Sequence, residues 1–162
     1  MIFNKEQIKL FLPHRDPFLF LDAIESIIAA PEIGEIKIAK DLLGAKVIAH
    51  YLTDPNHAIF QGHFPGRPIL PGVVQVEMMA QASSFVFTKL LKQSLETTRP
   101  NLEVALLSIE SAKFRKPIYP SMGLRIETLC IRYRSNMMTC EGKVFHENDL
   151  MSESTAMAFV KI

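Results

Sequence analysis

The sequence of 162 residues has almost no excess charge of either sign. Its 18 lysines and arginines stand against 17 aspartates and glutamates, which gives a net charge of +1. Affinity for nucleic acids comes largely from phosphate contacts and usually requires a clear basic excess, so we expect no nucleic-acid partner. By contrast, 48% of the residues are hydrophobic. This surplus indicates that another subunit covers part of the apolar surface.

Long apolar runs and cysteines are also scarce. A bilayer span needs roughly 18 apolar residues, and the most apolar segment, residues 69–87, is interrupted by five polar side chains. The N-terminus lacks the basic start, apolar run and cleavage site of a signal peptide. Cys130 and Cys140 are too few for a disulfide framework and too far apart for a redox or zinc motif. We therefore expect two buried free thiols in a cytoplasmic protein without a membrane span.

Repeats, low-complexity tracts and flexible linkers are missing as well, so we expect one domain over residues 1–162. Asn4 and Gln7 form a capping-box pattern at the start of a short helix that Pro13 ends. Four prolines and three glycines predict a loop over residues 54–72. Apolar and β-branched patterns predict strands at residues 18–28, 33–39, 46–53, 102–119, 124–134, 137–146 and 150–162.

One segment differs from this β-rich background. From residue 73 to about residue 92 the chain contains neither proline nor glycine, and Pro71 precedes it at a position that favours a helix start. Glu77 is its only charged side chain before Lys89. A helix of about 20 residues is about 30 Å long, and one this apolar must be wrapped by other structure. The pattern predicts an α+β fold in which a curved antiparallel sheet packs around one long helix.

The polar residues of this helix fall on a single stripe. Glu77, Gln81, Ser84 and Thr88 are spaced as neighbours along one helix face. A stripe facing solvent is the simple alternative, but it would normally carry more charges. A lone carboxylate in apolar surroundings has its charged form disfavoured, so we expect a raised pKa, which suits a general acid near neutral pH. Glu77 is therefore a candidate proton donor.

His63 is a candidate partner for Glu77. It lies in a stiff loop, residues 62–68, where a neutral imidazole beside a buried carboxylate can act as a general base. Most isolated histidines are ordinary surface or core residues, which is the alternative here. A metal site formed by His57, His63 and Glu77 matches no common ligand spacing, so we expect no metal. The histidines without an evident chemical setting are His14, His50, His57 and His146.

Gly72 lies at the expected start of the long helix. Backbone N–H groups there have no partner within the helix, and a glycine lets a negatively charged oxygen approach them closely. The alternative is that Gly72 only permits a tight Pro-Gly turn. A base, an acid and an oxyanion donor together indicate removal of a proton beside a carbonyl group and loss of a β-hydroxyl. That reaction is a dehydration.

The motifs resemble a known family over nearly the whole chain. They are LPHRDPFL at residues 12–19, GHFPGRPILPGV at 62–73, Glu77 with AQA at 80–82, and AKFRKP at 112–117. In this order they are similar to the FabZ-type (3R)-hydroxyacyl-acyl carrier protein dehydratases of type II fatty-acid biosynthesis. The sequence departs from that family at Asp16, where a tyrosine is usual, and at residues 53–58 and 120–123. The segment at 92–102 is also longer than usual.

The resemblance implies a hotdog fold that dimerises through continuous sheets and often assembles as a trimer of dimers. It implies that His63 is the general base and Glu77 the general acid, and that the two meet across the dimer interface. It assigns Gly72 to the thioester oxygen, and it implies substrate-binding positions at Val73, Gln81 and Phe64. No cofactor is implied. The partner is acyl carrier protein, and the acyl chain lies in an apolar tunnel at the interface.

Two other functions remain open alternatives. One is a non-catalytic acyl-binding hotdog protein, because the fold alone fixes no chemistry. The other is an acyl thioesterase. Acyl carrier protein is acidic, so a basic entrance is expected, although these charges can equally be solvated groups at a strand edge. The candidate docking residues are Lys113, Arg115 and Lys116, or Arg132 and Arg134.

Overall fold

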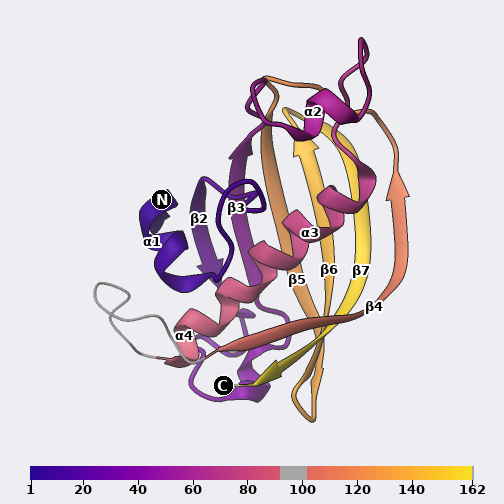
Figure 1. The fold of residues 1–162 in the computed structure, drawn as a ribbon. Coiled ribbons are helices and arrows are strands. Elements are labelled where there is room, and N and C mark those ends of the chain that lie inside the picture. Colours follow the sequence, from indigo (N-terminus) through magenta and orange to yellow (C-terminus); the bar gives the residue numbers. More distant parts are fainter. Residues whose placement is uncertain (92–101, 162) are drawn as a thin grey trace.

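The computed structural model describes residues 1–91 and 102–161. The strands are β1 (Phe3–Asn4), β2 (Ala23–Ile28), β3 (Lys46–Leu52), β4 (Glu103–Phe114), β5 (Gly123–Arg134), β6 (Met137–His146) and β7 (Asp149–Lys161). They form one antiparallel sheet in the order β1-β2-β3-β5-β6-β7-β4. The sheet curves around the helix α3 (Gly72–Ser83), which runs across its face (Figure 1). The expected α+β hotdog class is confirmed.

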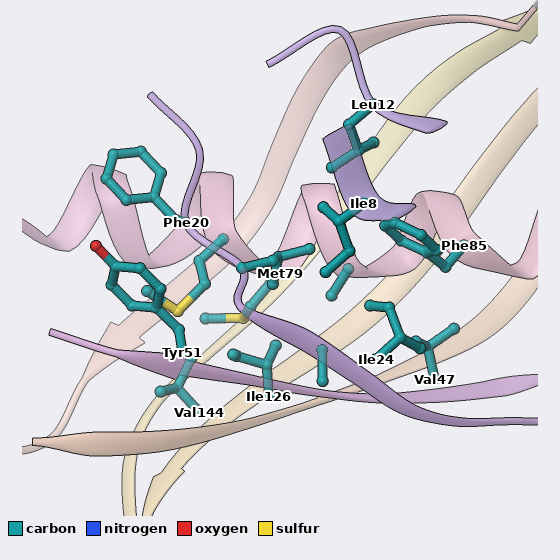
Figure 2. Packing of buried hydrophobic residues seen from close by; sticks show 14 of the residues in the cluster. Ile8, Leu12, Phe20, Ile24, Val47, Tyr51, Met79, Phe85, Ile126 and Val144 are labelled. Atoms are coloured by element: carbon teal, nitrogen blue, oxygen red, sulfur yellow. The ribbon is translucent and has the colours of Figure 1, made fainter. Parts of the chain in front are cut away.

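The long helix is continued by a 3-10 turn, η2 (Ser84–Phe87), and by a last helical turn, α4 (Thr88–Leu91). It therefore follows the predicted segment as far as residue 91, and residue 92 lies outside the described chain. Side chains on nearly every side of this helix are buried, as its composition predicted. Met79 and Phe85 pack against side chains of the sheet and of the N-terminal segment, including Ile8 (Figure 2). No helix in the described residues is long and apolar enough to cross a bilayer.

The first predicted strand is shorter than expected. Strand β2 begins at Ala23, whereas the sequence predicted a strand from residue 18. The reason is that the backbone of residues 18–20 bonds to a side chain and not to a neighbouring strand. The N–H of Phe20 donates to Oε1 of Gln81 (3.0 Å), and Nε2 of Gln81 donates to the carbonyl oxygen of Phe18 (2.9 Å).

The prediction of a strand at residues 33–39 is wrong. This segment forms turns and leads into the 3-10 helix η1 (Ala39–Leu42). Gly34 has a φ of +70°, which breaks an extended run. The carboxylate of Asp41 accepts the backbone N–H groups of Lys37 and Ile38 at 2.8 and 2.9 Å. These groups are therefore satisfied locally and do not pair in the sheet.

The remaining elements follow the sequence closely. Helix α1 (Lys5–Phe11) starts at the predicted capping box, in which Asn4 and Gln7 exchange two hydrogen bonds. The strands at the C-terminal end form the predicted antiparallel meander, and residue 162 lies outside the described chain. The predicted loop at residues 54–72 contains one short helical turn, α2 (Ile59–Gly62). The predicted strand at 102–119 ends earlier, at Phe114.

Strand β4 forms an open edge of the sheet. It pairs only with β7 in the described chain, and nearly all of its residues are exposed. A long exposed edge strand that carries large apolar side chains is a site for pairing with another chain. The large exposed hydrophobic residues of β4 are Val104, Leu106, Leu107, Ile109 and Phe114.

Candidate active site

His63 directly follows α2, and the loop after it holds the imidazole in place. The ring atom Nδ1 lies 2.9 Å from the carbonyl oxygen of Ile69. Because a carbonyl oxygen only accepts hydrogen bonds, Nδ1 carries the proton of the neutral ring, and Nε2 keeps its lone pair. The ring of Phe64 stacks on the imidazole with the two centroids 4.0 Å apart. His63 is therefore oriented so that Nε2 can accept a proton.

The N-terminus of α3 supplies unpaired backbone donors. The carbonyl oxygen of Pro71 accepts the N–H groups of Val74 and Gln75 at 3.1 and 3.3 Å. The two preceding N–H groups, of Gly72 and Val73, have no acceptor within the helix. They lie at the positive end of the helix dipole, where an oxygen with developing negative charge is stabilised.

The ring of Phe114 explains why position 72 holds a glycine. A Cβ atom at Gly72 would lie 2.7–2.9 Å from three atoms of this ring. Gly72 and Val73 line a cavity of about 440 Å³ together with His63 and Phe114. The structure therefore brings the candidate base and the candidate oxyanion donors to one cavity. Phe64 is half exposed and contacts this site through its stacking on His63.

Glu77 lines a second, smaller cavity of about 110 Å³. Its Oε1 lies 2.9 Å from Nε2 of Gln81 and 3.2 Å from Nε2 of His14. Gln81 is almost fully buried, and its amide also bonds to the backbone at Phe18 and Phe20, as described above. The polar stripe of the helix thus faces the interior and not the solvent.

The pKa of Glu77 differs from the sequence prediction. The interaction with His14 is the largest influence, and it lowers the pKa of the carboxyl group below its usual value. Burial acts in the opposite direction, and the hydrogen bond from Gln81 lowers the pKa further. The predicted rise is therefore wrong. It was based on burial alone, and the sequence did not reveal the imidazole and amide that face this carboxylate.

His14 is the residue that sequence reasoning missed. It lies in the segment before β2 and contacts a residue 63 positions later in the chain. Its spacing from Glu77 therefore gave no signal. The only indication in the sequence is its place inside the motif at residues 12–19, which resembles the family motif but assigns no role to the imidazole.

The two candidate proton-transfer residues do not share a cavity within one chain. In the part of the chain that the structure describes, the cavity at His63 and the cavity at Glu77 have no lining residue in common. Their meeting across a dimer interface, as the resemblance implies, stays a prediction. His57 does not join either site, because its Nε2 lies 2.9 Å from the carbonyl oxygen of Pro17 and its Nδ1 accepts the N–H of Ile59 at 3.2 Å.

Two basic residues, Arg115 and Lys116, line the His63 cavity. Both side chains are engaged in ion pairs, Arg115 with Glu153 at 2.6 Å and Lys116 with Asp149 at 2.8 Å. Lys113 approaches Glu153 less closely, at 3.8 Å. The other candidate docking residues, Arg132 and Arg134, lie at the end of β5, away from this cavity.

Comparison with known proteins defines the class. Residues 12–154 match the family model of the FabA-like domain. A dehydratase heterocomplex from Xenorhabdus doucetiae has a similar structure, with a TM-score of 0.67 and 14% identity over 96% of this chain and 91% of that chain. At this level of identity the likeness shows the fold alone. The molecule is therefore a hotdog-fold protein with a FabA-like domain.

Sequence relatives narrow this class further. The 3-hydroxyacyl-acyl-carrier-protein dehydratase FabZ of Campylobacter curvus is 33% identical over 154 residues, which are 95% of each chain. The enzyme of the same name from Rickettsia canadensis is 35% identical over 155 residues, which are 96% of this chain and 95% of that protein. The chain belongs to the FabZ-type 3-hydroxyacyl-acyl-carrier-protein dehydratase family.

Proposed function

We propose that this protein removes water from (3R)-3-hydroxyacyl groups carried on acyl carrier protein in fatty-acid biosynthesis, and that it forms the trans-2-enoyl thioester. The relatives that bear this activity in their names match the chain over nearly its full length. The observation that carries the proposal is the orientation of His63. Its Nδ1 is held by the carbonyl oxygen of Ile69, which leaves Nε2 as the basic atom, and His63 lines the same cavity as Gly72 and Val73 at the start of α3.

His63 and Gly72 act on the thioester end of the substrate. The thioester oxygen binds at the N–H of Gly72, with the N–H of Val73 beside it, and this polarises the carbonyl and acidifies the protons at C2. Nε2 of His63 removes one of these protons. The electron pair of the broken C2–H bond forms the C2–C3 double bond, and the bond from C3 to the hydroxyl breaks.

Glu77 acts on the hydroxyl end. In its protonated form, which the lowered pKa makes the minor form near neutral pH, it donates a proton to the departing hydroxyl, so that water leaves and the carboxylate remains. The reaction is balanced when the proton on His63 and the charge on Glu77 are neutralised through solvent after the products leave. Gln81 holds the carboxyl group in place, and the apolar cavity beside Glu77 accepts the first carbons of the acyl chain.

The active form in this proposal is a homodimer. His63 and Glu77 line separate cavities in one chain, so the mechanism needs a second copy that brings the two groups together. The open edge of β4 and its exposed apolar side chains support antiparallel pairing of two copies. A trimer of such dimers is the larger assembly that we propose.

The carrier docks near the mouth of the His63 cavity. Arg115 and Lys116 lie there and attract an acidic partner. Because both already pair with carboxylates of β7, the carrier must compete for them, which favours a weak and short-lived complex. We also propose the cytoplasm as the compartment, which the two free thiols Cys130 and Cys140 support.

The direct test uses a 3-hydroxyacyl-acyl carrier protein substrate and mass spectrometry of the acyl group. We expect loss of one water from the substrate with the native protein and none with His63→Ala or Glu77→Gln. Native-like rates in either variant would contradict the assigned roles. A thiol-reactive dye separates the alternatives, because a thioesterase releases the carrier thiol and a dehydratase does not. An acyl-binding protein without activity would retain the substrate unchanged.

A further inference from the structure

The contact between His14 and Glu77 has no part in the dehydration steps proposed above for His63, Gly72 and Glu77. Among the described residues that line the Glu77 cavity, two have titratable side chains, namely Glu77 and His14. They come from distant parts of the chain, one from α3 and the other from the segment between α1 and β2. Both are mostly buried, with 22% of the Glu77 side chain and 29% of the His14 side chain exposed.

The two donors near Glu77 converge on the same oxygen. Nε2 of His14 is 3.2 Å from Oε1, and Nε2 of Gln81 is 2.9 Å from Oε1. Among the described residues, no hydrogen bond reaches Oε2. Because Oε1 accepts the hydrogen bond from Gln81 and lies next to Nε2 of His14, it is a poor place for a proton, whereas Oε2 can carry one. The arrangement therefore makes the two carboxylate oxygens unequal.

The imidazole of His14 is itself held in one orientation. Its Nδ1 is buried, and within residues 1–91 and 102–161 it has no hydrogen-bond partner. A buried N–H without an acceptor is costly, especially on a charged ring, so the proton of the neutral ring belongs on Nε2, which faces Glu77. The adjacent backbone is fixed by Arg15, whose guanidinium donates to the carbonyl oxygens of Leu12 and His14 at 3.0 and 2.7 Å.

We propose that His14 is a positioning residue for the dehydration, which with Gln81 holds Oε1 of Glu77 and leaves Oε2 to deliver the proton to the substrate hydroxyl. This inference rests on the proposed function, in which Glu77 is the general acid. His14 does not touch the substrate in this scheme. It acts by holding the plane of the carboxyl group and by making the proton on Oε2 easier to release. The same contact lowers the pKa of Glu77, which makes the carboxyl group a stronger acid and its protonated form the minor one near neutral pH.

The test compares three replacements of His14 in the full-length protein. His14→Ala and His14→Met remove the donor, and we expect kcat to fall about 10- to 100-fold with KM within about twofold, because the acid is misplaced and not the substrate. His14→Gln has a side chain about as long as methionine but keeps an N–H, and we expect it to stay within about threefold of the native rate. His146→Ala, on β6 outside both cavities, is the control and should retain the native rate.

A pH profile separates positioning from a merely structural role. Loss of the His14 contact removes the main influence that lowers the pKa of Glu77. We therefore expect the apparent pKa that reports the ionisation of Glu77 in the kcat/KM profile to rise in His14→Met. In His14→Gln it should stay near the native value. If His14→Ala does not fold, the Met and Gln pair carries the same comparison.

The outcomes distinguish this inference from the proposed function. If Glu77→Gln abolishes dehydration while His14→Met retains both the native kcat and the native pH profile, Glu77 is the acid and the positioning role is overturned. Equal losses in His14→Met and His14→Gln with unchanged profiles would also overturn it, because the donor would then not matter. If Glu77→Gln itself keeps the native rate, it is the assignment of the general acid that fails.

Discussion

Gly72 and the ring of Phe114 approach so closely that no side chain fits between them. A Cβ atom at position 72 would lie 2.7 Å from the nearest ring carbon. The contact couples the first residue of the central helix to the open edge strand β4, where Phe114 is the last residue. The N–H groups proposed to bind the thioester oxygen are thus held in place by a strand that we expect to form the dimer interface.

The first prediction concerns this contact. In Gly72→Ala either the ring or the helix start must shift, so we expect a loss of about 1–3 kcal/mol in the free energy of unfolding. We also expect kcat to fall by about 10- to 100-fold, because the oxyanion donors move. Urea denaturation and the dehydration assay check both effects. Gly123→Ala is the control, because a Cβ there has no described atom within 4 Å. Equal behaviour of the two variants would count against the oxyanion role.

The second prediction concerns Gln81, which joins the helix to the segment before β2. Gln81→Leu removes the partners of the Phe20 N–H and the Phe18 carbonyl oxygen. A buried polar group without a partner is costly, so we expect the free energy of unfolding to fall by about 1–3 kcal/mol. Gln61→Leu changes an exposed glutamine in α2 whose side chain makes no hydrogen bond in the described chain, and it should be nearly neutral. Denaturation curves that coincide for the two variants would refute the bridging role.

Much of the fold could be predicted from local patterns in the sequence. The central helix was evident because a run of some 20 residues without proline, glycine or many charges has few other structures available. The last strands were evident from alternation and turn residues. The segments at 18–22 and 33–39 were mistaken for strands, because their backbone groups bond to the side chains of Gln81 and Asp41. Such contacts depend on where the chain folds back.

The site was predicted unevenly for the same reason. His63, Gly72 and Glu77 lie within 15 residues of one another, and their order and types already indicated an acid, a base and an oxyanion donor. His14 is far from them in the chain and meets Glu77 only after folding. The predicted direction of the Glu77 pKa shift was therefore wrong, because burial was visible in the sequence pattern and the facing imidazole was not.

The third prediction follows from the lowered pKa of Glu77. A carboxyl group whose pKa is lower in the folded than in the unfolded state stabilises the fold above the unfolded pKa, and this contribution is lost as the pH falls through the folded value. We expect Glu77→Gln to be less stable than the native protein at pH 7. The difference should shrink below the usual glutamate pKa of about 4.5. Urea denaturation at several pH values measures this, and a difference that grows on acidification would show that the sign is wrong.

The fourth prediction concerns the open edge of the sheet. Leu107 on β4 is 52% exposed in the single chain, and Leu43, between η1 and β3, is 51% exposed. If β4 forms the interface, Leu107→Lys buries a charge there and should convert dimers to monomers, whereas Leu43→Lys should not. Sedimentation velocity measures the oligomeric state of both. The Leu107 variant should also lose activity, because His63 of one copy no longer meets Glu77 of the other. If Leu107→Lys remains a dimer, β4 does not form the interface.

The last prediction asks whether one active site takes residues from two chains. In a dimer formed from one His63→Ala chain and one Glu77→Gln chain, the native His63 comes from one chain and the native Glu77 from the other. If these residues meet across the interface, the mixed dimer contains one complete site and one doubly defective site.

Two inactive variants should therefore restore activity when they are unfolded and refolded together. Random pairing makes half of the dimers mixed, and each has one of two sites intact, so we expect about a quarter of the native activity. Each variant refolded alone is the control and should remain inactive. If the mixture also stays inactive although mass spectrometry confirms mixed dimers, the two residues serve one site within a single chain. A conformational change within that chain would then have to bring the two separate cavities together.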